Sequence, residues 1–112
     1  MTQSLKLLFV CSRNRQRSLT AEHTFAIESG YDVRSAGTEP GARTKLSPDL
    51  IGWADVIFVM EKKHRDWIGQ RYADLVAGKP VINLMIADEY PYMDDELIDI
   101  LTNRVVASLD EF

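Results

Sequence analysis

Short apolar runs alternate with helical segments four times along the chain, and this alternation limits the folds open to it. The runs have strand length, and the most apolar of them are typical of strands buried on both faces of a parallel sheet. They cover residues 5–10, 31–36, 56–60 and 80–85. The pattern predicts an α/β domain with a four-stranded parallel sheet and helices on both of its faces.

Start and stop signals place the helices between these runs. We expect the first helix over residues 18–30, ending at Gly30, because glycine is a common helix terminator. A second, short helix is expected after Ser47, which can cap it. The third is expected over residues 61–74, where apolar side chains recur with helical spacing. The last is expected to begin after Asp94, with acidic residues in its first turn.

Length and charge narrow the class of protein. The chain has 112 residues, which suits one domain, so we expect residues 1–112 to form a single unit. Its net charge of −4 does not suit a nucleic-acid partner, because such domains are usually basic. The apolar runs are too short to cross a membrane, and the N-terminus lacks the pattern of a secretory signal. We therefore expect a cytoplasmic protein with no membrane or nucleic-acid partner.

Cys11 is the only cysteine of the chain. A single cysteine cannot form an internal disulfide or a zinc site built from paired cysteines. It suits a reducing compartment, in which a free thiol persists. Its chemical role therefore depends on the loop in which it lies.

That loop follows the first strand and opens the first helix. Backbone N–H groups at such a junction and the positive end of the helix form a natural anion site. Arg17 adds a planar guanidinium that suits bidentate phosphate binding. The same groups would stabilise a thiolate on Cys11, to which Ser18 could donate a hydrogen bond. The segment that follows the fourth run, with Asp88, is expected at the same edge of the sheet.

The Cys-x5-Arg spacing is the signature of cysteine-dependent phosphatases, and longer motifs make the resemblance specific. Residues 7–25 resemble the start of the low-molecular-weight protein tyrosine phosphatases, with matches at Asn14, Arg17, Ser18, Ala21 and Glu22. Residues 35–38 resemble the Ser-Ala-Gly-Thr segment of that family, and residues 54–60 its next core strand. Residues 86–90 resemble its Asp-Pro-Tyr loop.

The resemblance implies a phosphatase that needs no cofactor and no metal and acts on a phosphorylated protein or small molecule. Cys11 would form a phosphocysteine, Arg17 would bind the phosphoryl oxygens, and Asp88 would act as general acid and base. The resemblance also implies supporting positions. The remaining loop residues expected to bind phosphate or support the loop are Ser12, Arg13, Asn14, Arg15, Gln16, Ser18 and Ser35, and Tyr90 is expected to form a wall of the substrate pocket.

Several positions depart from the family pattern. Arg13 replaces a glycine, Gln16 replaces a second cysteine, and Glu89 replaces the proline of Asp-Pro-Tyr. Without the second cysteine, Cys11 has no local thiol to resolve its oxidised form. Ser12 and Arg15 stand where apolar wall residues are usual. Such a rim suits an extra negative charge beside the phosphate better than a phenyl ring.

The chain is also shorter than the family is expected to be. The missing stretch falls between Thr38 and Ser47, where the family has an aromatic wall and a loop-supporting histidine. His23 and His64 are expected to be structural or surface residues rather than partners of Cys11. Rival acids to Asp88 are Asp94 and Asp95, which we expect to cap and stabilise the last helix, and Glu89.

Three functions remain open from the sequence. The first is a phosphomonoesterase of the tyrosine phosphatase type, which should hydrolyse aryl phosphates through Cys11. The second is a phosphate-binding or phosphoprotein-binding module that has lost turnover, suggested by Arg13 and Glu89. The third is an arsenate reductase-like enzyme, which would need an external thiol because the chain has no second cysteine. The sequence predicts no particular oligomeric state.

Overall fold

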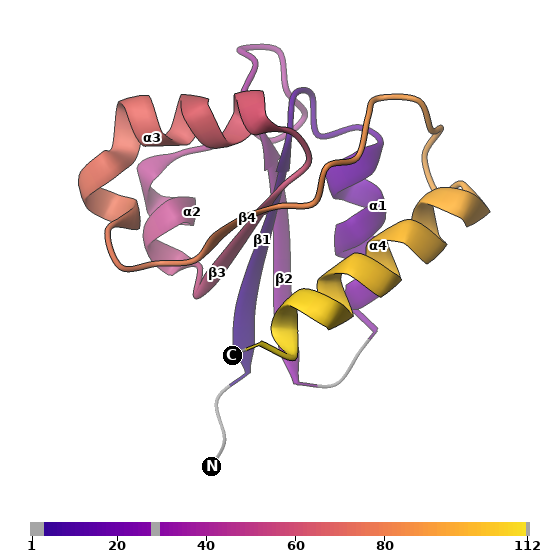
Figure 1. Ribbon diagram of the computed structural model, residues 1–112. Helices are drawn as coiled ribbons and strands as arrows, with labels where there is room; N and C mark the ends of the chain where they lie inside the picture. Colours follow the sequence, from indigo (N-terminus) through magenta and orange to yellow (C-terminus); the bar gives the residue numbers. More distant parts are fainter. Residues whose placement is uncertain (1–3, 28–29, 112) are drawn as a thin grey trace.

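The computed structural model describes residues 4–27 and 30–111, and in this part of the chain strands and helices alternate as predicted (Figure 1). The strands are β1 (Leu5–Cys11), β2 (Tyr31–Gly37), β3 (Val56–Val59) and β4 (Val81–Asn83). The helices are α1 (Arg17–Phe25), α2 (Pro48–Trp53), α3 (Lys62–Val76) and α4 (Asp95–Leu109).

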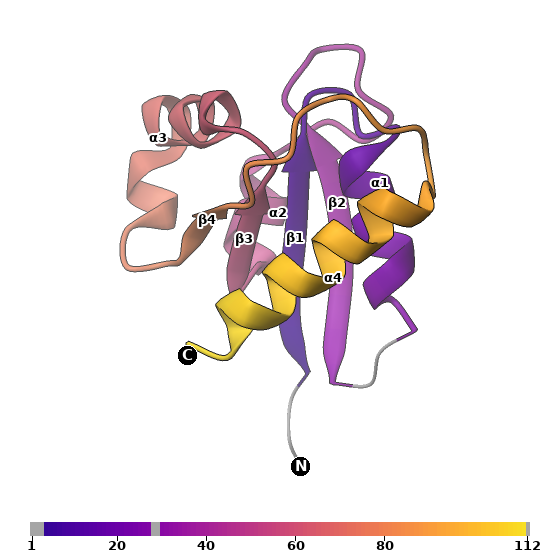
Figure 2. The ribbon, with the colours of Figure 1, turned by 45° about the vertical axis from the view of Figure 1, so that its right-hand side comes forward.

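The strands form one sheet of order β2-β1-β3-β4 in which every neighbouring pair is parallel. Helices α1 and α4 cover one face of this sheet, and α2 and α3 cover the other (Figure 2). The predicted α/β fold with helices on both faces is therefore confirmed. Because all the strands run in the same direction, their carboxyl ends meet at one edge of the sheet.

The two faces of the sheet bury separate cores, because successive side chains of β1 point to opposite sides. On the α1 and α4 face, Phe9 stacks between Phe25 and Phe58 at centroid distances of 5.7 and 5.2 Å. Helix α4 closes this core with Leu97, Leu101 and Val105, which are fully buried. On the opposite face the buried side chains include Leu8, Val10, Ile51, Ile57, Val59 and Ile68.

The predicted helix boundaries need correction at α1. This helix ends at Phe25, and Gly30, expected to end it, adopts a φ of 97° at the turn into β2 instead. Residues 28 and 29, also expected in this helix, lie outside the described residues. The predicted caps of α2 and α4 are confirmed, since the Ser47 hydroxyl accepts a hydrogen bond from Leu50 N and the Asp94 carboxylate accepts one from Leu97 N.

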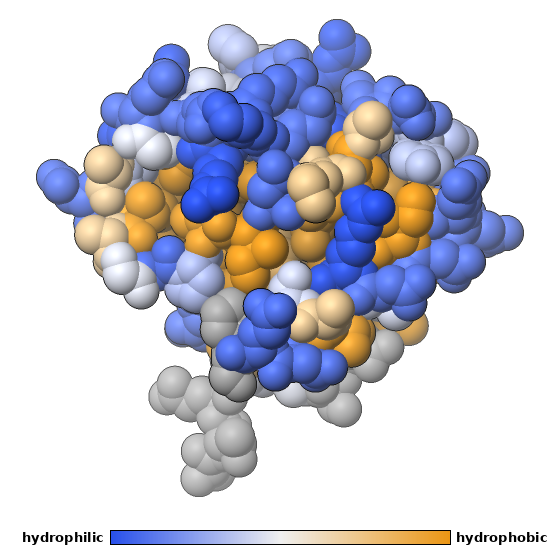
Figure 3. Space-filling model, viewed as in Figure 1, coloured by the Kyte–Doolittle hydropathy of each residue, from blue (hydrophilic) through white to orange (hydrophobic). Residues whose placement is uncertain are grey.

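Three segments gather at the edge where the strands end (Figure 1). They are the loop after β1, the connection between β2 and α2, and the long segment between β4 and α4. Figure 3 shows mostly polar side chains over this edge and a band of apolar surface below it. None of the described helices has the length and hydropathy needed to cross a membrane.

Candidate active site

The loop after β1 is folded around the Cys11 sulfur. Asn14 adopts a left-handed conformation with φ of 57°, which asparagine tolerates better than most residues. This turn directs the Asn14 N–H toward Cys11 Sγ at 3.3 Å. The Asn14 side chain donates a hydrogen bond of 2.8 Å to Ser18 Oγ and so ties the loop to the first turn of α1.

Cys11 itself is buried, with 3% of its surface exposed. Its sulfur lies 2.9 Å from Ser18 Oγ and close to the N-terminus of α1, which begins at Arg17. A backbone N–H, a hydroxyl and a helix N-terminus are the groups that stabilise a thiolate over a thiol. The thiolate is the nucleophilic form of cysteine, so the loop suits Cys11 to a nucleophilic role.

Arg17 is also buried, and its guanidinium is held by two acceptors from distant segments. Nη1 donates hydrogen bonds to Glu61 Oε2 at 2.6 Å and to the Ile86 carbonyl at 2.7 Å. Burial works to raise the pKa of Glu61, but the hydrogen bond and charge of Arg17 outweigh it, so this pKa lies below its usual value. Arg17 is therefore fixed in orientation before any ligand binds.

His64 supports the loop from α3. Its Nδ1 accepts a hydrogen bond from the Glu61 N–H, and its Nε2 lies 2.9 Å from Ser12 Oγ. Burial is the main cause that lowers the pKa of His64 to about 4, and the nearby positive charge of Arg17 lowers it further. A neutral ring whose Nδ1 is an acceptor carries its proton on Nε2, so His64 donates to Ser12.

The connection between β2 and α2 backs the loop from the other side. The N–H groups of Thr38, Glu39 and Arg43 donate to the carbonyls of Cys11, Ser12 and Arg13 at 3.0, 2.9 and 3.0 Å. The close approach needs glycine at position 37, where a Cβ would lie 2.6 Å from the Ser12 carbonyl oxygen. Backbone hydrogen bonds therefore brace the first part of the loop, at residues 11–13.

The loop after β1 and Asp88 surround a small pocket of about 110 Å³ at the edge where the strands end. Asp88 lies at its mouth with its side chain 61% exposed, and its Oδ1 is 3.8 Å from Arg17 Nε. A thiol, a fixed guanidinium and a carboxylate thus face one cavity. The residues that line the pocket are Cys11, Ser12, Arg13, Arg15, Gln16, Arg17 and Asp88.

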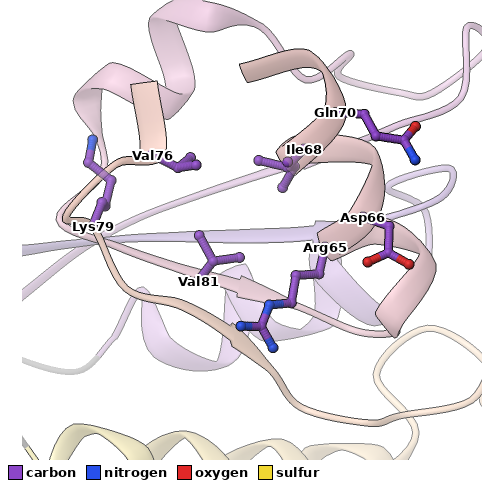
Figure 4. A pocket seen from close by; sticks show the side chains of 8 residues that line it. Arg65, Asp66, Ile68, Gln70, Val76, Lys79 and Val81 are labelled. Atoms are coloured by element: carbon purple, nitrogen blue, oxygen red, sulfur yellow. The ribbon is translucent and has the colours of Figure 1, made fainter. Parts of the chain in front are cut away.

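A larger hollow of about 500 Å³ lies elsewhere, between α3 and β4 (Figure 4). Its floor is apolar, from Ile68, Val76 and Val81, and Arg65 and Lys79 stand on its rim. No cysteine or histidine is among the described residues that line this hollow. Size alone therefore does not identify the candidate active site, and the chemical groups select the smaller pocket.

Comparisons with known proteins identify the fold. No protein-family model matches this sequence, and the search of curated proteins finds no match to it either. Among solved structures, the YwlE arginine phosphatase of Geobacillus stearothermophilus has a TM-score of 0.75 at 22% identity, over 96% of this chain and 94% of that chain. The chain has the fold of the low-molecular-weight protein tyrosine phosphatases.

Two further structures illustrate this fold. The tyrosine phosphatase amsI of Erwinia amylovora has a TM-score of 0.76 at 22% identity, over 98% of this chain and 94% of that chain. A low-molecular-weight protein tyrosine phosphatase from T. tengcongensis has a TM-score of 0.72 at 17% identity, over 97% and 100%. The low-molecular-weight phosphatase fold is thus shared over nearly all of this chain, although few residues are identical.

Within this phosphatase fold, two predicted site residues lie away from the pocket. Tyr90, expected as a substrate wall, lines a separate hollow together with Ile100 and Arg104. The Ser35 hydroxyl, expected to support the loop, donates to Glu22 of α1 at 2.7 Å. The other predicted residues lie in the loop or line the pocket, so the structure brings most of the expected set together.

Sequence reasoning missed two supports of the loop. His64 is structural, as expected, but its hydrogen bond to Ser12 supplies the loop-supporting histidine that the short connection after Thr38 was expected to lack. Glu61, the partner of Arg17, was not among the residues expected at the site. The signal available was the position of Glu61 and His64 directly after a buried strand, at the edge where parallel strands place ligand sites.

Proposed function

We propose that the protein is a cysteine-dependent phosphomonoesterase, with residues 1–112 as its single catalytic domain. The observation that carries the proposal is the single pocket that Cys11, Arg17 and Asp88 share, in the fold common to tyrosine and arginine phosphatases. Its substrate is a phosphorylated protein or small molecule. A free Cys11 thiol is best maintained in the reducing environment of the cytoplasm.

The first step is attack of the Cys11 thiolate on phosphorus. A sulfur–phosphorus bond forms as the bond from phosphorus to the leaving oxygen breaks. The loop N–H groups and Arg17 bind the three peripheral oxygens, whose charge is spread in the transition state. Asp88, at the mouth of the pocket, protonates the leaving oxygen. The products of this step are a phosphocysteine and the free alcohol or phenol.

The second step is hydrolysis of the phosphocysteine. Asp88, now a carboxylate, takes a proton from a water molecule that attacks phosphorus. The sulfur–phosphorus bond breaks, Cys11 leaves as a thiolate, and inorganic phosphate is released. Ser18, whose Oγ lies 2.9 Å from Cys11 Sγ, stabilises the departing sulfur. No step requires a metal ion or a cofactor.

The test is turnover of p-nitrophenyl phosphate by the wild type and by Cys11→Ser. We expect wild-type turnover, its loss in Cys11→Ser, and phosphoryl transfer to Cys11 detected by mass spectrometry after acid quench. Thermal unfolding of both proteins serves as the folding control. Phosphate binding without turnover and without phosphocysteine would contradict the proposal and support a phosphate-binding module instead.

Arsenate reduction is the weaker alternative. That chemistry reduces arsenate with electrons from thiols, and Cys11 is the only thiol that the chain supplies. An external thiol would have to provide the remaining electrons. Thiol-dependent release of arsenite by the wild type, with no turnover of any aryl phosphate, would favour this function over phosphate ester hydrolysis.

A further inference from the structure

The rim of the pocket indicates which phosphate esters fit it. We propose that Arg15, assisted by Arg13, binds a second anionic group of the substrate, carried close to the phosphate that is removed. The inference rests on the proposed phosphomonoesterase function and deepens it by assigning a substrate class. Arg15 is then a specificity-determining residue for that reaction.

The first argument is the availability of the Arg15 charge. The buried arginine of the pocket, Arg17, is bound to Glu61, and Arg13 is paired with Glu39. Arg15 is exposed and lines the pocket, and it has no carboxylate partner within 4.0 Å among residues 4–27 and 30–111. A free guanidinium beside a phosphate site is suited to a carboxylate or a second phosphate.

The second argument concerns the exchangeable partner of Arg13. Its Nε lies 3.3 Å from Glu39 Oε2, and the two side chains are 74% and 49% exposed. Exposed pairs of this kind are weak and screened by salt, so a substrate anion can replace Glu39. The Arg13 carbonyl meanwhile accepts a hydrogen bond from Arg43 N, which keeps the backbone in place.

The third argument is the contrast between the pocket and the rest of the chain. The whole protein carries a net charge of −4, yet the described residues that line this pocket include three arginines and only one carboxylate. Clefts lined by one sign of charge concentrate ligands of the opposite sign. A phosphate alone is already served by Arg17 and the loop N–H groups, so the rim arginines are left for a further anion.

The fourth argument is the absence of an aromatic wall. No aromatic side chain is among the described residues that line the pocket, and Tyr90 lines a different hollow. A phenyl ring would therefore gain little from stacking. The substrate class is a phosphate ester with a carboxylate or second phosphate near the scissile bond, either a small phosphorylated acid or a phosphorylated residue beside an acidic one.

The experiment compares 4-carboxyphenyl phosphate with 4-carbamoylphenyl phosphate, which has a neutral group of nearly the same size. We expect wild-type kcat/KM to favour the carboxylate by about tenfold, the scale of one close contact between opposite charges at a protein surface. Arg15→Gln should reduce this ratio to about twofold, mainly through KM. Comparing the ratio between variants cancels the difference between the two leaving groups.

Arg65→Gln is the matched control, because it removes the same charge from an exposed residue that lines the other hollow. It should leave the substrate ratio at its wild-type value. A second arm uses phosphotyrosine peptides with Glu or Gln next to the phosphorylated residue. A preference for Glu there assigns an acidic peptide, whereas a preference seen only with the aryl phosphates assigns a small acid.

The outcomes separate this inference from the proposed function. Turnover with equal kcat/KM for charged and neutral substrates, in both arms, overturns the role of Arg15 and leaves the phosphatase standing. A carboxylate preference that survives in Arg15→Gln also overturns it. No turnover of any of these substrates by the wild type overturns the proposed function, and the inference falls with it.

Discussion

The pocket is built from two regions of opposite character. The first region is the loop between β1 and α1 together with the strand end and helix start that flank it. Its main polar side chains are buried, since Cys11, Asn14, Arg17 and Ser18 are each at most 3% exposed. The segment between β4 and α4 that carries Asp88 is mostly exposed, and the Asp88 side chain is 61% exposed. One region is part of the core, and the other lies on the surface.

The second region is fixed mainly at its ends. Before Asp88, Arg104 donates to the carbonyls of Leu84 and Met85, at 2.7 Å each. After it, Met93 N donates to Thr20 Oγ1 at 2.9 Å. Among residues 4–27 and 30–111, the one polar contact of the Asp88 side chain is with Arg17, at 3.8 Å. In the proposed mechanism the phosphate-binding groups are thus preorganised, whereas the acid can adjust to the position of the leaving oxygen.

The largest expected effect is a loss of activity without a loss of stability when Asp88, in the exposed region, is replaced. Asp88→Asn should lower kcat with p-nitrophenyl phosphate by about 10²–10⁴-fold, the usual contribution of a positioned acid or base. The melting temperature should not change, because the side chain is exposed and has no hydrogen-bond partner among the described residues. Steady-state kinetics and thermal unfolding check the two halves of this expectation.

Matched controls test the rival acids near Asp88. Asp95→Asn changes an exposed carboxylate in the first turn of α4, and Glu89→Gln changes the exposed neighbour of Asp88. Both should retain kcat within about twofold of wild type, well below the general-acid contribution. A larger loss in Glu89→Gln than in Asp88→Asn would transfer the acid role to Glu89.

The next effect is a pH dependence of stability that arises in the buried region. Burial lowers the pKa of His64 from 6.5 to about 4, so the unfolded state binds more protons between these values. The stability contributed by neutral His64 is complete above pH 6.5 and is lost as the pH falls toward 4. At about 1.4 kcal/mol per pKa unit, the loss is about 3 kcal/mol.

Urea unfolding across this pH range measures the effect. In His64→Gln the decline between pH 6.5 and 4 should largely disappear. His23→Gln is the control, because His23 is partly exposed and bonds Tyr92 in the other region, so the decline should remain. An unaltered decline in His64→Gln would show that other groups cause it. Glu61, whose pKa is lowered below 4.5, acts in a more acidic range.

A smaller effect tests why the loop holds a left-handed residue at position 14. Asn14→Gly keeps the backbone conformation but loses the hydrogen bond to Ser18, which should lower the free energy of unfolding by about 1 kcal/mol. Asn14→Ala loses the bond and also strains the backbone, by about 1–2 kcal/mol more. Urea unfolding gives both values, and equal losses in the two variants would contradict the role of the backbone conformation.

The fold and the centre of the site could be predicted because their signals are local in sequence. Each strand is one apolar run, and the Cys11 loop with Arg17 is one continuous segment between a strand and a helix. The missed supports join distant positions, since Ser12 and His64 are 52 residues apart and Arg17 and Glu61 are 44 apart. Local sequence patterns cannot predict such pairs, because their contact depends on which strands are neighbours in the sheet.

The two expected residues that lie away from the pocket, Tyr90 and Ser35, also depend on non-local packing. Tyr90 was expected in the pocket because residues 86–90 resemble the Asp-Pro-Tyr loop of the family. Neighbouring residues in an irregular segment can face different surfaces, however, and Tyr90 packs toward the core beneath α4. Ser35 lies on β2, beside the loop, but its hydroxyl donates a hydrogen bond to Glu22 of α1 instead of to the loop. Where a segment has no regular repeat, sequence spacing does not determine the direction of a side chain.

The smallest expected effect concerns the exposed region, which also contains a residue other than glycine with a positive φ. Met85 has a φ of 56°, and the residue is 72% exposed, so its side chain contributes little packing to offset the strain. Met85→Gly should therefore raise the free energy of unfolding by up to about 1 kcal/mol, because relief of strain exceeds the entropy that glycine loses on folding. Met85→Ala keeps the Cβ and should give no gain. A stabilisation equal in Ala and Gly would mean that the methionine side chain, rather than the backbone, is unfavourable there.

The opposite signs expected for Asn14→Gly and Met85→Gly follow from the same difference between the regions. In the buried loop, the residue with positive φ is fixed by its own side-chain hydrogen bond. In the exposed segment, the side chain of the residue with positive φ contributes little to holding it.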